Sequence, residues 1–370
     1  MKNMIFEYPI KETLGNVFRI IQGHQITDEE IYKSYGSIPV YTGAGELKGF
    51  WDKALVEKDD LPCLTYATKA FDGTIVIRNE IFDANNTAVL IIKDEYKGIV
   101  ILEWISIILR KIFLNIMTSK EGVSYLNREI VEAIEINIPD RKTQENLIVK
   151  HKAINERLNR TKEILRRCEA LRNKFINIEY ETYQDKNVDI SRCIDYMSGN
   201  SGLTEELIYH TLQMGSQKYP VLSSATEERT MMGVVPKCKI NNKDLKVFEG
   251  KEGLLVTRNG KAGQTRYLIE GAYTINDHAY ILFNKKDSKY HINLKWLAIQ
   301  YRSQFLMYSS SADNGTWNMT GFFEHTKIDI PSKKEQDDIV ASYEKLEKRI
   351  EMIIAIEKHY QNLLQKEIAS

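Results

Sequence analysis

The sequence predicts an α+β protein in which two similar mixed α/β domains are joined by two long helices. The helices are expected to pack as an antiparallel coiled coil, with a pseudo-two-fold axis relating the halves of the chain. Two observations predict this arrangement. One set of phrases occurs twice at a near-constant spacing, and each copy ends in a long segment with apolar residues at coiled-coil spacing. The predicted boundaries are 1–140 for the first domain, 141–180 for the first helix, 181–331 for the second domain and 332–370 for the second helix.

The repeat is clearest where each domain meets its helix. Ile136-Asn137-Ile138-Pro139 is followed by Gln144, and 192 positions later Ile328-Asp329-Ile330-Pro331 is followed by Gln336. The same spacing pairs Trp104 with Trp296 and Thr65 with Thr257. Farther upstream, Ile38-Pro39-Val40-Tyr41 matches Tyr219-Pro220-Val221-Leu222 at a spacing of 181, so an insertion is expected within residues 235–253 of the second copy.

Each domain combines short strands with one apolar helix. Runs of β-branched or aromatic residues at 74–77 and 279–283, bounded by Gly, Asn and Asp, predict strands. Helical stretches are expected to begin near Lys97 and Leu294. The most apolar stretch, residues 99–109, contains Glu103 and is about half as long as the roughly 20 residues that span a membrane. It predicts a buried helix, so neither a membrane anchor nor a membrane partner is expected.

Ile-x-Ile-Pro predicts a final strand that ends at the proline, and a long helix follows each time, from Thr143 and from Ser332. Apolar residues recur at intervals of three and four along both helices. These predicted helix–helix packing residues are Leu147, Ile154, Leu158, Leu165, Cys168 and Phe175 in the first and Ile339, Tyr343, Leu346, Ile350, Ile353, Tyr360 and Leu364 in the second. About 35 residues would form a rod of roughly 50 Å. The charged residues of both helices are expected to face solvent.

Composition excludes several classes of protein. Hydrophobic residues make up 43% of the 370 residues and charged residues 28%, as in a folded globular protein. Lysine plus arginine and aspartate plus glutamate both total 51, which excludes a strongly basic DNA-coating protein but leaves a local positive surface possible. The four cysteines, Cys63, Cys168, Cys193 and Cys238, form no CxxC pair, so buried free thiols in a cytoplasmic protein are expected.

Two nearly two-fold-related domains on a paired helical rod suit duplex DNA, whose strands are themselves related by two-fold axes. At this point the sequence resembles the specificity subunits of type I restriction–modification systems. The resemblance covers nearly the whole chain and rests on the duplicated Ile-x-Ile-Pro phrase, on residues 38–42 and 219–224, on 255–263, and on Thr274-Ile275-Asn276-Asp277-His278-Ala279.

The resemblance implies a noncatalytic subunit with two target-recognition domains, each reading one half of a split DNA target. It also implies that the helices set the gap between the halves and dock modification subunits, expected to be two, which a restriction–translocase subunit joins. S-adenosylmethionine, ATP and magnesium would then belong to those partners. The first copy departs from the second, with Tyr66-Ala67-Thr68-Lys69-Ala70-Phe71 opposite Arg258-Asn259-Gly260-Lys261-Ala262-Gly263. The two domains are therefore expected to read different sequences.

No catalytic, cofactor or metal motif is found. HExxH and GxSxG are absent, a P-loop would need glycine where Leu255 stands, and Gly43-Ala44-Gly45 lacks the third glycine of a dinucleotide-binding loop. The methyltransferase phrases Asn-Pro-Pro-Tyr and Asp-Pro-Pro-Tyr are also missing. The sequence therefore assigns no catalytic residue, cofactor site or metal ligand to this chain.

The best DNA-contact candidates lie between residues 258 and 266. Glycine lets a backbone approach a phosphate, arginine can address guanine, and asparagine can address adenine. The candidate DNA-binding residues are Arg258, Asn259, Lys261, Arg266, Ser223, Ser224 and Arg229 in the second domain and Thr42, Lys48, Tyr66, Lys69 and Arg78 in the first. The alternatives are a solvated charged hairpin for 258–266, a core position for Tyr66, and turn formation for the Ser and Thr residues. Trp317 is expected to anchor a core.

Three other functions stay open at this stage. A self-sufficient methyltransferase or nuclease would bind S-adenosylmethionine or cleave DNA alone. A DNA-recognition subunit of a type IIB-like assembly would share the domains but not the partners. A coiled-coil protein adaptor would show no salt-sensitive DNA binding.

Overall fold

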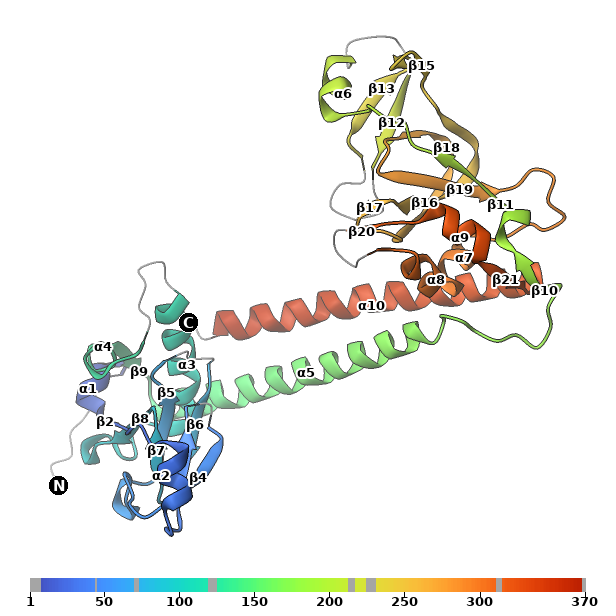
Figure 1. Ribbon diagram of the computed structural model, residues 1–370. Coiled ribbons are helices and arrows are strands. Elements are labelled where there is room, and N and C mark those ends of the chain that lie inside the picture. The colour runs from blue at the N-terminus through green and yellow to red at the C-terminus, as the bar shows by residue number, and fades with distance from the viewer. Residues whose placement is uncertain are drawn as a thin grey trace. The chain divides into compact units, whose positions relative to one another are not determined.

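The computed structural model describes residues 8–43, 45–69, 73–118, 125–211, 217–223, 231–310 and 315–367 (Figure 1). The chain divides into two compact units. The first comprises Met1–Lys162 with Ala355–Ser370, and the second comprises Glu163–Ile354. Each unit therefore contains one globular head together with the adjoining parts of both long helices.

The described residues of the first head form two sheets, one strand pair and four short or medium α-helices. Its sheets have the strand orders β2-β8-β5-β6 and β4-β3-β7, and β1 pairs with β9. The strands are β1 (Ile10–Thr13), β2 (Phe18–Gln22), β3 (Ile38–Thr42), β4 (Leu47–Trp51), β5 (Cys63–Ala67), β6 (Ile75–Arg78), β7 (Asp83–Asn85), β8 (Thr87–Ile92) and β9 (Glu135–Ile138). The helices are α1 (Leu14–Val17), α2 (Asp28–Lys33), α3 (Leu102–Thr118) and α4 (Arg128–Glu132).

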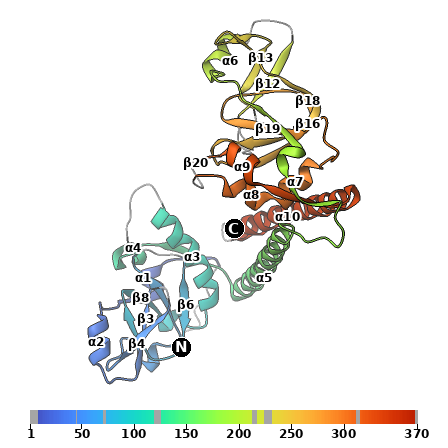
Figure 2. The same cartoon turned by 45° about the vertical axis from the view of Figure 1, so that its right-hand side comes forward.

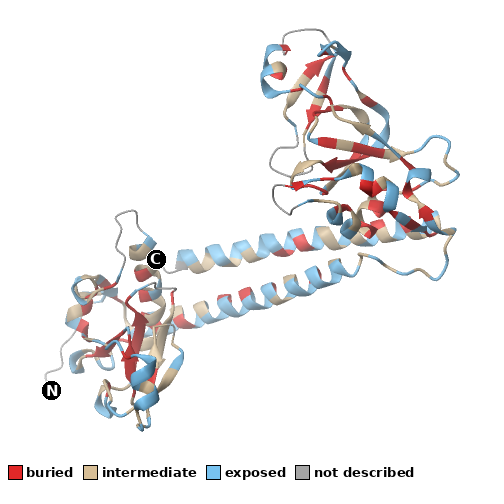
Figure 3. Ribbon diagram, in the orientation of Figure 1, coloured by how far each residue is buried: buried red, intermediate tan, exposed pale blue. Residues whose placement is uncertain are grey.

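The core of the first head lies between β5, β8 and α3. Every residue of β5 and β8 is buried (Figure 3), as expected of strands that are covered on both faces. The predicted buried helix is α3, which begins a few residues after Lys97 and buries Trp104, Ile105, Leu109 and Phe113. No helix of the described residues is long and apolar enough to cross a membrane.

The second head has the same plan on one larger sheet, of strand order β11-β19-β16-β18-β12-β13. Its strands are β10 (Asp185–Asp189), β11 (Ile194–Ser198), β12 (Lys218–Leu222), β13 (Gly233–Pro236), β14 (Lys239–Ile240), β15 (Lys243–Asp244), β16 (Phe248–Thr257), β17 (Asn259–Gly260), β18 (Thr265–Ile275), β19 (Ala279–Asn284), β20 (Gly315–Thr316) and β21 (Lys327–Ile330). Its helices are α6 (Glu205–Thr211), α7 (Leu294–Gln300), α8 (Arg302–Met307) and α9 (Met319–His325).

Strand pairing confirms that the two heads share one fold. In the first, β3 runs parallel to β7 with Val40 opposite Asp83. In the second, β12 runs parallel to β18 with Val221 opposite Thr274. The hairpin β3–β4 corresponds to β12–β13, and the trio β2-β8-β5 corresponds to β11-β19-β16. The single long strand β18 takes the places of both β6 and β7, which is why six strands form one sheet in the second head.

The same pairing corrects one detail of the sequence alignment. Ala67 lies opposite Thr87 at the start of β8, whereas Thr257 lies opposite Ala279 at the start of β19. The residue equivalent to Thr257 is therefore Ala67, not Thr65, because the spacing of the copies is 190 between β5 and β16, whereas it stays 192 between β8 and β19. The predicted insertion in the second copy contains the hairpin β14–β15.

The long helices are α5 (Arg141–Asn173) and α10 (Lys333–Glu367). Ser332 begins α10 as predicted: its hydroxyl accepts from the Glu335 amide at 3.3 Å, and the Glu335 carboxylate accepts from the Ser332 amide at 2.9 Å. The predicted start of α5 at Thr143 is wrong. Asp140 is the N-cap and accepts from the Thr143 amide at 3.0 Å, so the helix begins two residues earlier, at Arg141.

Within the second unit the two long helices pack antiparallel. The Phe175 ring meets the Tyr343 ring at 5.6 Å, and Arg172 pairs with Glu347 at 3.6 Å. Leu165 and Cys168, which precede Arg172 on α5, form a cluster with Leu346, Ile350 and Ile353 of α10. Ile350 and Ile353 follow Glu347, so the two helices run in opposite directions. In the first unit Ile154 and Leu158 of α5 are buried, and Tyr360 and Leu364 of α10 are half-buried.

Two of the predicted helix–helix residues have another role. Leu147 packs against the core of the first head, and Ile339 packs against the core of the second. Their neighbours Ile148 and Val340 are buried in the same cores. The first turns of each long helix therefore belong to a head, because the preceding strand, β9 or β21, leads the chain directly onto the head surface. In the second unit α7 and α8 lie beside the start of α10 in both views (Figures 1 and 2).

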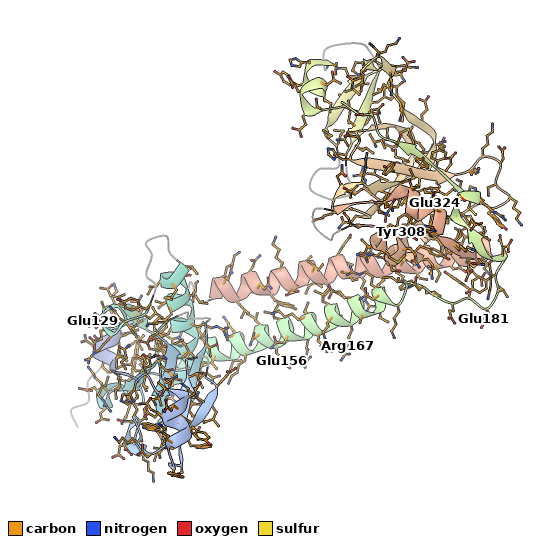
Figure 4. All side chains as sticks on the ribbon, viewed as in Figure 1. Glu129, Glu156, Arg167, Glu181, Tyr308 and Glu324 are labelled. Atoms are coloured by element: carbon orange, nitrogen blue, oxygen red, sulfur yellow. The ribbon has the colours of Figure 1, made fainter. Side chains whose placement is uncertain are left out.

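Charged residues of α5 such as Arg160 and Arg167 face solvent, as predicted, whereas Arg172 pairs with Glu347 across the seam. Arg160 pairs with Glu156 at 2.8 Å, and Arg167 pairs with Glu163 at 2.9 Å, each one helical turn away. Figure 4 labels Glu156 and Arg167 on this helix. Such exposed pairs stabilise the helix only slightly and leave its charged face available to other molecules.

Three of the four cysteines are buried free thiols, and Cys238 is half-buried. Burial raises the pKa of the Cys63 thiol to about 12 and that of the Cys193 thiol to about 11. Both side chains are therefore protonated at neutral pH and pack as small apolar groups.

A buried glutamine fixes each long helix to its head. Gln144 accepts from the Ile101 amide at 2.8 Å and donates to the carbonyl oxygens of Ile99 and Pro139 at 2.9 and 2.8 Å. Gln336 accepts from the Asn293 amide at 2.8 Å and donates to Pro331 at 3.2 Å. These bonds explain why the glutamine recurs after Ile-x-Ile-Pro. One side chain provides hydrogen-bond partners both for a backbone amide at the start of the head helix and for a carbonyl oxygen at the end of the last strand.

Replacement of Gln144 or Gln336 by alanine is expected to destabilise the corresponding unit by about 3 kcal/mol, because buried backbone groups lose their only side-chain partner. Urea unfolding monitored in each variant would measure this loss. Gln361, an exposed residue of α10, provides the matched control, and its alanine variant should unfold at the wild-type midpoint. Equal midpoints for all three variants would contradict a clamping role.

Candidate nucleic-acid interface

The candidate interface of the second head is the loop that joins β16 to β18. Gly260 and Gly263 have φ angles of +87° and +80°, which glycine adopts readily. The short strand β17 in this loop pairs with β20, and the Trp317 amide donates to the Arg258 carbonyl oxygen at 2.7 Å. Backbone hydrogen bonds therefore hold the loop in a defined conformation at the end of the sheet.

Trp317 anchors this loop to the core, in agreement with the prediction that it is a core residue. Its side chain is buried, and the indole Nε1 donates to the Phe305 carbonyl oxygen at 2.9 Å. Its ring also contacts the rings of Phe305 and Phe322, with centroid separations of 6.0 and 5.0 Å. The polar loop thus rests on an aromatic cluster.

Two partners orient the Asn259 side chain. Its Nδ2 lies 2.9 Å from His278 Nδ1, and its Oδ1 accepts from the Thr316 hydroxyl at 3.3 Å. An amide has two donor hydrogens and two acceptor lone pairs, so one of each stays available to an incoming group. That pair of groups is what the N6 and N7 atoms of adenine match.

Two cationic residues, Arg258 and Lys261, flank this asparagine in the loop. Arg258 is half-buried, donates to the Asp277 carbonyl oxygen at 3.3 Å and lies 5.8 Å from the Tyr280 ring centroid. Lys261 is exposed. Arg266 lies on β18 beside Leu255 rather than in the loop, and burial lowers the pKa of its guanidinium. Lys261 and Arg258 are therefore better placed than Arg266 to meet a phosphate.

The turn between β18 and β19 lies next to this loop. The Arg258 amide donates to the His278 carbonyl oxygen at 2.8 Å, and the Asn276 amide donates to the Leu222 carbonyl oxygen at 3.3 Å. Ser223 follows Leu222 directly, so the end of β12 reaches the same edge of the sheet. The candidates Ser224 and Arg229 lie outside the described residues.

The first head builds the corresponding edge from different residues. The Thr68 carbonyl oxygen accepts from the Leu126 amide at 2.8 Å, as Arg258 does from Trp317. Lys69 forms a bridge with Tyr125, as Asn259 does with Thr316. Thr68 and the exposed Lys69 therefore stand where the second head has Arg258 and Asn259.

The structure reassigns three of the predicted contacts in the first head, Tyr66, Lys48 and Thr42, and also Arg78. Tyr66 is fully buried with its ring 4.8 Å from that of Phe113, so it belongs to the core. Lys48 is only 19% exposed, because it pairs with Asp28 at 3.1 Å and donates to the Ile26 carbonyl oxygen. Thr42 accepts from the Glu46 amide at 3.3 Å, the turn-forming role named as its alternative.

Arg78 is buried and does not reach the surface as a contact. Its guanidinium lies 3.5 Å from the Tyr41 ring centroid and donates to the Gly45 carbonyl oxygen at 2.8 Å. Glu80 accepts from the Tyr41 hydroxyl at 2.6 Å and so fixes the ring on which the guanidinium stacks. Burial lowers the pKa of Arg78. This arginine fixes the β3–β4 turn, which includes Gly45 with a φ of +85°.

Replacement of Arg78 by methionine keeps the apolar stem but removes the bond to Gly45, so the β3–β4 turn should loosen. We expect a loss of about 2 kcal/mol in the unfolding free energy of the first unit and weaker DNA binding through that head. Calorimetry and DNA titration would measure both. Lys53, an exposed cation of the same head, serves as control, and its methionine variant should retain both properties. A methionine variant with wild-type stability would refute this role.

Sequence reasoning missed several residues at these edges. His278 and Thr316 orient Asn259 although they are 19 and 57 positions away from it, and only the strand pairing reveals the proximity. Thr68 was missed because the alignment placed Tyr66 opposite Arg258. Asn86, with a φ of +53°, occupies the β7–β8 turn, and its backbone carbonyl oxygen accepts from the Thr68 hydroxyl at 3.3 Å. The asparagine itself was the available signal, because asparagine tolerates the positive φ that such a turn requires.

No group of three or more His, Cys, Asp or Glu side chains that could hold a metal ion occurs among the described residues. The chemistry that these edges support is recognition: hydrogen-bonding amides, hydroxyl groups and cations on fixed turns.

Comparison with known proteins agrees with this architecture. Residues 210–365 match the model of a family described as "Type I restriction modification DNA specificity domain". No curated protein matches the chain. The S subunit of a type-I restriction-modification system from M. genitalium has 15% identity and a TM-score of 0.54, with 97% of this chain and 94% of that chain covered.

Two further solved structures have the same fold. The HsdS subunit from Thermoanaerobacter tengcongensis has 14% identity and a TM-score of 0.52, over 100% of this chain and 98% of that chain. A chain described under "complex assembly and conformational transition of the type I R-M system" has 13% identity and a TM-score of 0.59, over 99% and 98%. The predicted resemblance is thus confirmed, in sequence over residues 210–365 and in fold over nearly the whole length.

Proposed function

We propose, from the specificity-domain match over residues 210–365 and the S-subunit fold of the whole chain, that this protein is the noncatalytic DNA-reading subunit of a type I restriction–modification enzyme. The observation that carries the proposal is the duplicated sheet edge. In each head the equivalent turn places a polar side chain at the end of a strand, the exposed Lys69 in the first head and Asn259 in the second, where His278 and Thr316 hold it.

Each head reads one half of a bipartite target. The equivalent positions carry different residues, Lys69 in the first head and Asn259 in the second, so the two halves differ in sequence. Phosphate contacts from exposed lysines supply affinity, and base-edge contacts supply specificity. DNA binding should therefore weaken as salt increases.

The long helices set the gap between the half-sites and dock the modification subunits, two per chain. Helices of 33 and 35 residues correspond to about 50 Å at a rise of 1.5 Å per residue, which is about one and a half turns of duplex DNA. Methyl transfer from S-adenosylmethionine belongs to the modification subunits, and ATP-driven translocation and cleavage belong to a restriction subunit that joins them. The protein acts in the cytoplasm.

Two substitutions in the second head distinguish base reading from phosphate binding. Asn259→Ala should cost about 1–3 kcal/mol for the cognate second half-site and relax specificity at one base pair. Lys261→Ala should weaken binding to all sequences alike. It should also reduce the slope of log binding constant against log salt concentration by about one. Titrations at several salt concentrations, with DNA mutated in either half, would measure these effects.

Lys243, an exposed residue of the β14–β15 hairpin, is the matched control, and its alanine variant should bind as the wild type does. If Asn259→Ala weakened every DNA sequence equally, or affected the first half-site, the assignment of this loop to base reading would fail. A chain that binds partner proteins but shows no salt-sensitive DNA binding would instead indicate the adaptor function.

A further inference from the structure

Each head carries a short acidic helix with the same sequence pattern. Thr27-Asp28-Glu29-Glu30-Ile31-Tyr32 leads into α2, and 177 positions later Thr204-Glu205-Glu206-Leu207-Ile208-Tyr209 leads into α6. Each helix lies against the second strand of the equivalent hairpin, α2 on β4 and α6 on β13. The two helices therefore occupy the same place in the two heads.

Packing accounts for the isoleucine of this pattern. A Cβ atom added to Gly49 of β4 would lie 2.3 Å from Ile31 Cγ2, and one added to Gly233 of β13 would lie 2.6 Å from Ile208 Cγ2. In both heads a glycine on the strand thus makes room for the isoleucine of the helix, which fixes the helix to the sheet.

Helix capping accounts for the threonine and for part of the acidic charge. The Thr27 hydroxyl accepts from the Glu30 amide at 3.2 Å, and the Glu30 carboxylate accepts from the Thr27 amide at 2.7 Å. The Thr204 hydroxyl accepts from the Leu207 amide at 3.2 Å. Carboxylates in the first turn also interact favourably with the helix dipole.

Neither packing nor helix capping accounts for the tyrosine of the pattern. Tyr32 is 90% exposed and Tyr209 is 75% exposed, so neither ring is buried in its own head. Among the described residues, the Tyr209 ring lies 5.9 Å from the ring of its neighbour His210, a contact that leaves the tyrosine mostly exposed. Tyrosine is among the residues that contribute most at protein–protein interfaces, because its ring buries a large area with little loss of conformational entropy.

We propose that Tyr32 and Tyr209 are equivalent anchors at which each head binds one copy of the modification subunit, a contact additional to any along the long helices. This rests on the proposed function. On α2, Asp28 pairs with Lys48 and Glu29 pairs with Lys33, but the three carboxylates of the first turn outnumber these two cations. The first turn of α6 carries Glu205 and Glu206. This net negative charge beside each tyrosine disfavours DNA, whose phosphates it repels. The same charge fits a basic protein surface with a recess for the ring. The same pattern on both heads requires two copies of one partner.

The test uses the full chain and the modification subunit encoded with it. In a titration followed by native mass spectrometry or sedimentation, Tyr32→Ala and Tyr209→Ala should each leave one binding step unchanged and weaken the other by about tenfold. The double variant should weaken both steps. Tyr35 is the matched control: it is fully exposed on the first head but has no counterpart in the repeat, and Tyr35→Ala should bind both copies normally.

Because the anchors are exposed, the variants should fold and should bind DNA alone as the wild type does. Two normal binding steps for the double variant would overturn this inference and leave the proposed function intact. Weaker DNA binding by Tyr32→Ala without any partner would assign the surface to DNA and would also overturn it. A wild-type chain that takes up no modification subunit would overturn the proposed function itself.

Discussion

Trp317→Ala is expected to lower the unfolding free energy of the second unit by about 3–5 kcal/mol, the usual cost of truncating a buried tryptophan. The substitution removes the indole donor to Phe305 and the ring contacts to Phe305 and Phe322. The loop that contains Arg258 and Asn259 loses its support at the same time. Reading of the second half-site should therefore fail even where the unit stays folded.

Leu282→Ala separates these two effects. Leu282 is fully buried in the same core cluster, so its truncation should also cost about 2–5 kcal/mol. It lies on β19, away from the 258–263 loop. Chemical denaturation should give comparable losses for both variants, while DNA titration at low temperature should show a defect for the second half-site only in Trp317→Ala. Equal defects would mean that stability alone, and not the anchor, governs recognition.

Gly263→Ala is expected to have the second largest effect. The glycine has a φ of +80°, and an added Cβ would lie 2.4 Å from the Phe305 carbonyl oxygen. The alanine variant combines conformational strain with a clash against rigid backbone, each of about 1–3 kcal/mol. The loop must move, so binding to the second half-site should decrease by roughly a hundredfold, which corresponds to about 2.7 kcal/mol.

Gly260→Ala is the matched control for this substitution. Gly260 has a φ of +87°, but no atom lies within 4 Å of the place its Cβ would take. Gly260→Ala should therefore lower the unfolding free energy only through the backbone strain of a positive φ, by about 1 kcal/mol. This variant should bind DNA more tightly than Gly263→Ala. If the two variants bound equally well, close packing of the loop on Phe305 would not determine its function.

The duplicated fold could be predicted because its signals are local and repeated. Ile-x-Ile-Pro, the buried glutamine and the apolar helix near Trp104 each indicate the same element in both copies. The residues that pack between α5 and α10 could be predicted from heptad spacing. The packing of the first turns of those helices could not, because Leu147 and Ile339 fit the same spacing although they face a head.

The candidate site was predicted only in part, because it depends on contacts between distant segments. The Arg258–Lys261 loop was found from its composition. Tyr66 was assigned to the interface because an alignment of sequences cannot detect a two-residue shift that strand pairing reveals. Arg78 and Lys48 carry charges that suit DNA, yet stacking on Tyr41 and pairing with Asp28 commit them to the fold.

The most direct test of the central claim, that the two heads read two separate half-sites, is to map methylated adenines in DNA from cells that express this chain with its modification subunit. The mapped sites should form one motif of two short specific blocks separated by a nonspecific gap of fixed length. Asn259→Ala should relax only one block. A single uninterrupted motif, or relaxation of both blocks by Asn259→Ala, would contradict the account.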